Sequence, residues 1–135
     1  MTQRRLIDTN VIVRHLVQDH PRHSAMASRL FAASDHGDLT LVILPAVLAE
    51  CVFVLESFYQ HPRRQIAEAL QSLIGSPGIE LGDLAIYLDA LTRYGRTQLH
   101  IVDCILATAA TADRVPLATF DHDFKTFRDV TVDVS

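Results

Sequence analysis

Four acidic residues stand at positions that favour chemistry over packing. Asp8 follows a short apolar run at residues 4–7 and precedes an apolar-periodic helix. Asp121 follows a second apolar run at residues 116–119. In open α/β sheets, functional sites form at the carboxyl ends of strands. The sequence therefore predicts that both acids lie at such ends, although an ordinary Asp-rich turn would also account for Asp121.

Glu50 is the third acid, in a helix expected at residues 45–59. Glu50 and Glu56 flank the apolar sector of that helix, so a helical wheel does not separate them. Their positions along the helix axis separate them. With a rise of about 1.5 Å per residue, Glu56 lies roughly 9 Å further from the helix start than Glu50. Glu50 is thus the acid that can reach a strand end. Its structural alternative is a flank carboxylate that meets water or an arginine.

Asp103 is the fourth acid, in the first turn of a helix expected at residues 101–112. Apolar side chains go all the way round this helix, which predicts burial on every side. A buried carboxylate is costly unless it is paired or bound to a metal. The helix dipole also favours an acid in a first turn, but it does not explain one inserted into an apolar run.

Several carboxylates in one place repel each other and raise their own pKa values, so the cluster requires a cation. Sites made of carboxylate oxygens suit Mg²⁺ or Mn²⁺. Mg²⁺ held by carboxylates suits reactions at phosphates, where the metal orients and activates a water. The hypothesis is that the same acids are catalytic residues and metal ligands: Asp8, Glu50, Asp103 and Asp121.

Short apolar strands alternate with helices along the chain. Strands are expected at residues 4–7, 39–43, 79–81, 116–119 and 131–134, and helices at 10–17, 21–34, 45–59, 62–74, 83–94 and 101–112. Residues 120–127 are expected to hold a turn and a short helix. This alternation predicts the α/β class, with a parallel sheet covered on both faces and a buried first strand. The length of 135 residues and the lack of a linker-like tract predict one domain over residues 1–135.

Composition and charge indicate the kind of partner and the cellular compartment that the protein is expected to have. The net charge of −4 speaks against broad neutralisation of nucleic acid, although local arginines and metal ions leave a nucleic-acid enzyme possible. Cys51 and Cys104 lie in apolar helical segments without zinc spacing, as expected of free thiols in a reducing cytosol.

The interrupted apolar stretch near the start argues against a signal peptide. The run at residues 41–49 is too short to span a bilayer. A cytoplasmic protein without membrane contact is expected.

The order and spacing of these motifs resemble the PIN domain. The resemblance rests on Asp8-Thr9-Asn10 after the first strand, on Glu50 and Asp103 in helices, and on Thr119-Phe120-Asp121 after a late strand. It covers essentially the full length. The segments 8–14 and 119–124 are similar to those of VapC toxins from bacterial toxin–antitoxin pairs.

The resemblance implies a three-layer α/β/α fold with a central, mostly parallel sheet. It implies a metal-dependent endoribonuclease of a type II toxin–antitoxin system, which hydrolyses RNA phosphodiester bonds at a four-carboxylate site. Mg²⁺ is the implied cofactor, with Mn²⁺ as a substitute. The implied partners are the RNA substrate, a cognate antitoxin protein and a second copy in a homodimer.

By the same analogy, several polar residues would support the acids or the substrate. Asn10 and Thr119 would position the acids or the attacking water, and Asp123 would cap a helix or assist Asp121. The candidates for phosphate contact, which are otherwise solvated surface charges, are Arg14, Arg63, Arg64 and Lys125. His100 and His122 are interpreted as bystanders. Cys104 and the lead-in His100-Ile101-Val102 depart from the commonest family pattern, which bears on subgroup and substrate.

Other readings of the first motif fit less well. A haloacid-dehalogenase-type phosphatase needs a second aspartate where Asn10 stands. A phospho-receiver domain needs an acidic pair at the first strand and a late lysine near the site, whereas Lys125 follows the Asp cluster. The remaining alternative is a catalytically silent PIN-like module that binds RNA or protein.

Overall fold

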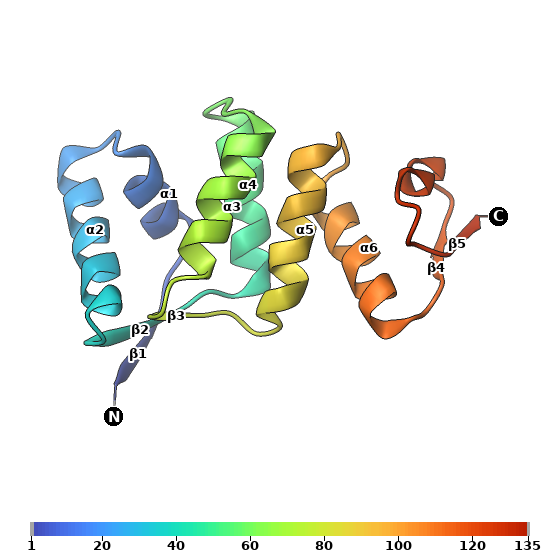
Figure 1. Ribbon diagram of the computed structural model, residues 1–135. Helices are drawn as coiled ribbons and strands as arrows, with labels where there is room; N and C mark the ends of the chain where they lie inside the picture. Colours follow the sequence, from blue (N-terminus) through green and yellow to red (C-terminus); the bar gives the residue numbers. More distant parts are fainter. Residues whose placement is uncertain (1, 135) are drawn as a thin grey trace.

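The computed structural model describes residues 2–134 of the chain (Figure 1). Its strands are β1 (Gln3–Leu6), β2 (Leu39–Val42), β3 (Ile79–Glu80), β4 (Leu117–Thr119) and β5 (Val132–Val134). Its helices are α1 (Thr9–Val17), α2 (Pro21–Asp35), α3 (Pro45–Ser57), α4 (Arg63–Ile74), α5 (Leu84–Arg96), α6 (Ile101–Asp113) and the 3₁₀ helix η1 (His122–Thr126). The helices and strands predicted from the sequence all form, with ends that differ by one or two residues.

Local sequence explains where the first helices begin. The Asp8 carboxylate caps α1 by accepting a hydrogen bond from the Val11 N–H at 3.1 Å. Pro21 and Pro45 occupy the first positions of α2 and α3, where a missing N–H is not needed. Asp8 and Pro45 thus also lie where the chain leaves β1 and β2, whereas Pro21 follows α1.

The strands pair in parallel but form two separate sheets. The first sheet has the order β1-β2-β3, with Gln3 opposite Leu39 and Leu41 opposite Ile79. The second contains β4 and β5, with Leu117 opposite Val132. Within residues 2–134, β1 and β4 thus each have one edge without a neighbouring strand. The α/β class and the parallel pairing are confirmed, and the division of the sheet is a feature that the alternation of elements did not predict.

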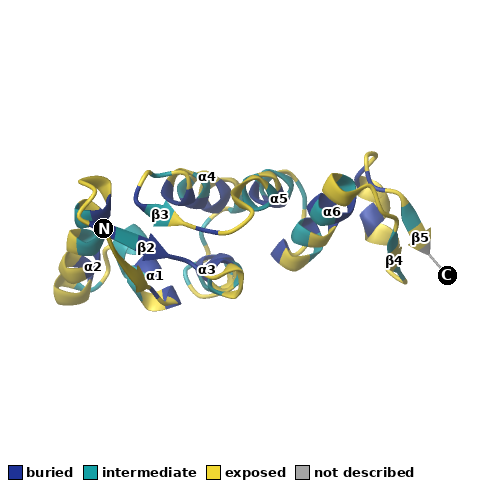
Figure 2. Cartoon of the chain, turned by 90° about the horizontal axis from the view of Figure 1, so that it is seen from below, coloured by how far each residue is buried: buried dark blue, intermediate teal, exposed yellow. Residues whose placement is uncertain are grey.

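Helices cover the first sheet on both sides. In Figure 2, α4 lies on one side of the strands, and α1 and α3 lie on the other. The core between them is one cluster that includes Ile12, Leu41, Leu70 and Leu91, each fully buried. Close packing of these side chains is the main source of stability in a domain of this size. No helix within residues 2–134 is long and apolar enough to cross a membrane.

The C-terminal part of the chain extends away from the first sheet. We call residues 101–134, from α6 through β5, the C-terminal module. It is attached mainly through the packing of α6 on α5, with a smaller contact between α6 and α3. Figure 1 shows β1 and the N-terminus at one end of the molecule, and β4 and β5 at the other.

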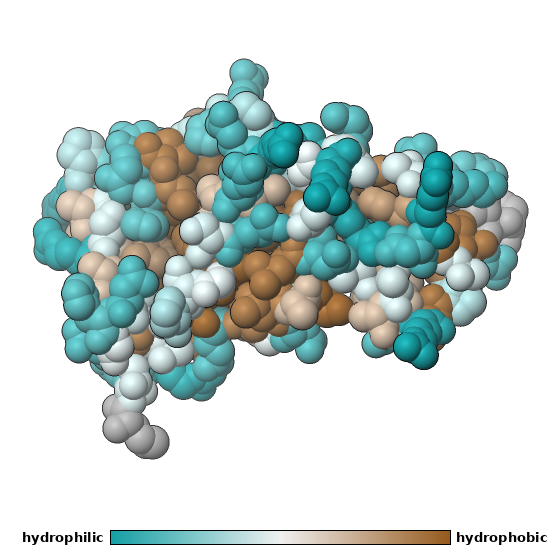
Figure 3. Space-filling view, viewed as in Figure 1, coloured by the Kyte–Doolittle hydropathy of each residue, from teal (hydrophilic) through white to brown (hydrophobic). Residues whose placement is uncertain are grey.

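Two burial predictions are wrong. The first strand was expected to be buried, yet all four residues of β1 are exposed, and Leu6 is 67% exposed. The helix around Asp103 was expected to be buried on every side, yet Val102 is 55% and Leu106 is 44% exposed. The reason is the division of the sheet, since nothing within residues 2–134 covers the outer edge of β1 or this side of α6. Figure 3 shows further hydrophobic surface in the lower middle of the view, beside the lower part of α5.

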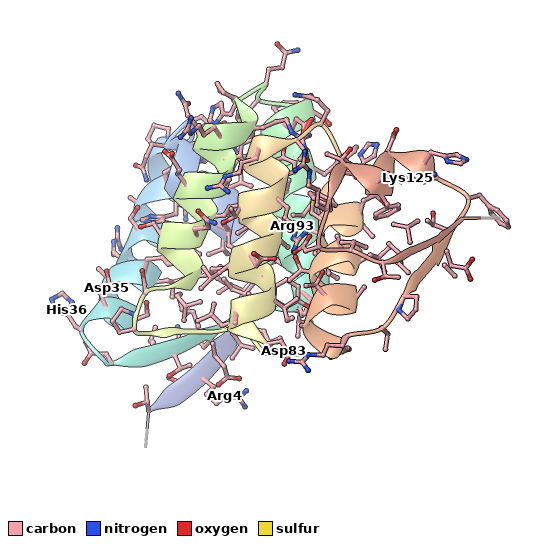
Figure 4. All side chains as sticks on the ribbon, turned by 45° about the vertical axis from the view of Figure 1, so that its right-hand side comes forward. Arg4, Asp35, His36, Asp83, Arg93 and Lys125 are labelled. Atoms are coloured by element: carbon pink, nitrogen blue, oxygen red, sulfur yellow. The ribbon has the colours of Figure 1, made fainter. Side chains whose placement is uncertain are left out.

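Arg93 holds the C-terminal module on α5. Its guanidinium donates to both carboxylate oxygens of Asp129, at 2.9 and 2.6 Å, and to Asp89 at 2.9 Å. It also lies over the Phe127 ring, 4.9 Å from the centroid. The Arg93 side chain is only 12% exposed, and its hydrogen bonds hold the pKa of Asp129 below the usual range. Figure 4 shows Arg93 on the side of α5 that faces this module.

A second arginine joins the central helices. Arg63 at the start of α4 pairs with Glu56 of α3 at 2.9 Å and lies 3.8 Å above the Tyr94 ring of α5. It also donates to the backbone carbonyls of Tyr94, at 3.2 Å, and Leu99. Arg63 was a candidate for phosphate contact, but these bonds use its guanidinium inside the fold. Its role in this structure is to connect helices.

We predict that Arg93→Ala lowers the free energy of unfolding by about 1–3 kcal/mol, because charge-assisted hydrogen bonds of a largely buried arginine are lost. The matched control is Arg64→Ala, which removes the same charge from an exposed residue paired with Glu68 at 3.6 Å. The control should change the free energy by less than about 0.5 kcal/mol. Urea unfolding followed by circular dichroism measures both. Equal effects of the two substitutions would contradict the role assigned to Arg93.

Candidate functional site

Asp8 and Glu50 form one half of the predicted site. Asp8 lies two residues beyond β1, and Glu50 lies in the second turn of α3, which follows β2. Both side chains are exposed. Burial raises the pKa of the Cys51 thiol to about 12, and the negative charges of Glu50 and Asp8 add to this effect. Because β1 and β2 are neighbouring parallel strands, Asp8 and the start of α3 both lie beyond the carboxyl end of the first sheet.

Asp103 and Asp121 form the other half, in the C-terminal module. Asp103 is partly buried in the first turn of α6. Asp121 is exposed, two residues beyond β4, and its carboxylate caps η1 by accepting a hydrogen bond from the Asp123 N–H at 2.8 Å. The Asp121 N–H in turn donates to the Thr119 hydroxyl at 2.9 Å. Thr119 therefore fixes the backbone that carries Asp121.

One chain does not bring the two halves together. Asp8 caps α1 and Asp121 caps η1, and these helices lie at opposite ends of the molecule in Figure 1. Among residues 2–134, no three His, Cys, Asp or Glu side chains are close enough to hold a metal ion. The carboxylate oxygens are the right donors for Mg²⁺, but their arrangement in a single chain does not fit it.

The same acids are not used as ion-pair partners. Within residues 2–134, none of Asp8, Glu50, Asp103 and Asp121 forms a salt bridge. Glu56, the other acid on the flank of α3, is instead bound by Arg63 and by the Tyr94 hydroxyl. The two acids that the helical wheel could not separate thus differ in their partners, and Glu50 is the one left exposed.

The basic residues predicted to contact phosphate differ in whether acidic side chains already bind them. Arg14 on α1 donates to Asp19 at 2.9 Å and to the Tyr59 hydroxyl at 3.3 Å, so its charge is already balanced. Arg64 is exposed on α4 and pairs with Glu68 at 3.6 Å. Lys125 is exposed on η1 and projects from the module in Figure 4. Arg64 and Lys125 are the ones most accessible to a phosphate.

A pocket beside Asp8 was not predicted. It has a volume of about 360 Å³ and lies between α1 and α2. Its lining residues are Asp8, Asn10, Val11, Arg14, His23, Met26, Ala27 and Leu30. The spacing of Asn10 and Arg14, four residues apart on one helix, indicates a shared face. The contribution of α2 depends on how the two helices pack, which the sequence pattern does not specify. The pocket places Asn10 and Arg14 next to the first half of the site.

Comparison with known protein families gives one clear result. The profile of the PIN domain matches residues 5–130 of the chain. The matched segment contains both halves of the site and nearly all of the described structure. No curated protein matches the chain.

We predict that neither cysteine reacts with a thiol reagent in the folded protein at pH 8. Both thiols are buried, and burial raises the pKa of Cys51 to about 12 and that of Cys104 to about 11, so the reactive thiolate is scarce. Colorimetric titration should detect no thiol in buffer and both in guanidinium chloride. Rapid labelling of Cys51 in buffer would show that the environment next to Asp8 and Glu50 is more open than described.

Proposed function

The chain belongs to the PIN domain family, and from that premise we propose that it is a nuclease that hydrolyses RNA phosphodiester bonds. More specifically, we propose an endoribonuclease toxin of the VapC type from a type II toxin–antitoxin pair. The catalytic residues in this proposal are Asp8, Glu50, Asp103 and Asp121. We further propose that residues 1–135 act as one PIN domain in the cytoplasm.

The main support is that all four acids lie within the family match and remain without an ion-pair partner among residues 2–134. Glu56 and Asp129, in contrast, are each paired with an arginine. Asp8 and Asp121 do cap helices, but a cap uses one carboxylate oxygen and leaves the other for a ligand. Both also stand beyond the carboxyl end of a parallel strand, where α/β proteins bind their substrates.

The proposed cofactor is Mg²⁺, or Mn²⁺ in its place. Carboxylate oxygens are the ligands that these ions prefer, and a bound ion supplies charge neutralisation at a phosphate. Because a single chain does not gather the acids, we assign the ion to an arrangement in which the two halves of the site meet. Asp8 and Glu50 would contribute from one half, and Asp103 and Asp121 from the other.

The remaining site residues would bind the RNA or orient the acids. Thr119 holds the turn that carries Asp121 through its hydrogen bond to the Asp121 N–H. Asn10 lines the pocket beside Asp8 and would position a group of the substrate there. Lys125, exposed four residues after Asp121, and Arg64 are the candidates for contact with the RNA backbone. Arg14 and Asp123 would then act indirectly, by shaping the pocket and the turn.

The proposed protein partners are a second copy of the chain and a cognate antitoxin. The exposed Phe53 and Phe58 of the α3 region provide apolar surface of the kind that protein partners cover. The alternative function is a catalytically silent PIN-like module that binds RNA or protein. The separation of the acids in one chain is the observation that favours this alternative.

We predict that the purified protein, freed of any antitoxin, cleaves RNA with Mg²⁺ and stops when the metal is chelated. Asp8→Asn and Asp103→Asn should each lower the rate by at least about 100-fold, because each removes a charged ligand or catalytic oxygen. The matched control is Asp113→Asn, an exposed acid at the other end of α6, which should retain the wild-type rate. Gel analysis of a labelled RNA measures all four proteins.

Equal cleavage by wild type, Asp8→Asn and Asp103→Asn would show that the site is wrong. An inert wild type that still binds RNA would favour the silent module.

A further inference from the structure

The free edges of β1 and β4 are complementary. The Ile7 N–H donates to the Val42 carbonyl of β2 at 3.2 Å. Since successive residues of a parallel strand direct their backbone groups to opposite edges, the Leu6 N–H points to the free edge of β1. The Leu117 N–H likewise donates to Thr131 beside β5 at 2.8 Å, which leaves the backbone groups of Ala118 on the free edge of β4. Each edge therefore offers unpaired donors and acceptors to another strand.

The acids define the alignment of these two edges. Asp8 lies two residues beyond the last residue of β1, and Asp121 lies two residues beyond the last residue of β4. If β4 lies parallel to β1, the carboxyl ends of both strands coincide and the two acids meet above one sheet edge. Parallel addition thus joins the two halves of the site without moving any residue within its own half.

Apolar surface lies next to both edges. Leu6 on β1 and Leu44 after β2 are exposed on one side, and Val102 and Leu106 of α6 are exposed on the other. A parallel sheet is ordinarily covered on both faces, and contiguous exposed apolar surface marks an interaction site. Pairing of β1 with β4 would bring α6 over the uncovered part of the first sheet.

The contacts of the C-terminal module indicate which chain provides β4. Within one chain, the module is held on α5 by the bonds of Arg93 to Asp129 and by the bond of the Thr108 hydroxyl to Asp89 at 2.8 Å. To reach β1 of its own chain, the module would have to turn about residues 97–100 and break these bonds. A second copy can offer its β4 with every such bond intact.

We propose that two copies of the chain exchange strands, with β4 of each copy adding in parallel to the free edge of β1 of the other. The exchange is reciprocal, so a two-fold symmetric dimer satisfies both pairs of edges and closes. Each four-carboxylate site then combines Asp8 and Glu50 of one chain with Asp103 and Asp121 of its partner. This last assignment rests on the proposed function, whereas the strand exchange does not.

The first experiment needs no activity. Light scattering should give a dimer for the wild type. Leu6→Pro removes the N–H on the free edge while keeping the bond from Ile7 to β2, so it should raise the dimer dissociation constant by tenfold or more, on the order of one lost hydrogen bond at each of two junctions. Leu6→Ala keeps the N–H and is the matched control, with a smaller change. Circular dichroism checks that the Leu6→Pro chain is folded. A monomeric wild type, or a dimer that Leu6→Pro does not weaken, would overturn the exchange.

The second experiment distinguishes exchange from closure within one chain. Asp8→Asn and Asp121→Asn chains, each inactive alone, are unfolded together and refolded as a mixture. In an exchanged heterodimer one site has both substitutions and the other has neither, so about a quarter of the wild-type rate should return. Closure within each chain leaves every site with one substitution and restores nothing, which would overturn the proposal. If the wild type itself does not cleave RNA, the proposed function fails, and the dimer measurements alone decide the exchange.

Discussion

The ion pairs of Arg93, together with the packing of α6 on α5, hold the C-terminal module in its place. The pair with Asp129 connects α5 with the turn after η1, and the Arg93 guanidinium also lies over the Phe127 ring and pairs with Asp89 within α5. Charge-assisted bonds of a largely buried guanidinium are stronger than those of an exposed pair. Because they hold the C-terminal module on the far side of α5, β4 pairs with β5, and no strand within residues 2–134 covers the outer edge of β1. The division of the sheet, the exposure of β1 and the separation of the acids all follow from this placement.

The position of the C-terminal module separates the acids that lie within the family match. The PIN match extends over both halves of the acid set, while a single chain keeps them apart. Carboxylates of the two halves that are held apart do not repel each other, and Asp8 and Asp121 each cap a helix instead. A site divided in this way would be completed only when two halves meet, which makes assembly a condition of activity. The proposed exchange is the arrangement that completes it with the least change to the chain.

Much of the fold could be predicted from the sequence because its signals are local. Apolar periodicity and the prolines at residues 21 and 45 define helix positions within one or two residues. Proximity to a strand end separated Glu50 from Glu56, and the structure shows Glu56 occupied by Arg63. The strand that would cover the outer edge of β1 in the proposed dimer, β4, is in contrast more than a hundred residues away in sequence. Nothing in residues 4–7 specifies whether that neighbour is present.

The two wrong burial predictions concern surfaces that a second chain could cover. An apolar pattern reports that a surface has to be covered, but it does not say by which chain. Leu6, Val102 and Leu106 are uncovered in one chain and would be covered in the exchanged dimer. Asp129 was not singled out at all, because its partner on α5 lies 36 residues earlier and only the packed structure brings them together.

A crystal structure of the protein grown with Mn²⁺ tests the central claim most directly, since the ion is located by its anomalous scattering. We predict one site in which Asp8 of one chain and Asp121 of its partner flank the same ion, with β4 and β1 of different chains in parallel. Carboxylates that stay apart without an ion between them, or that converge from a single chain, would contradict it.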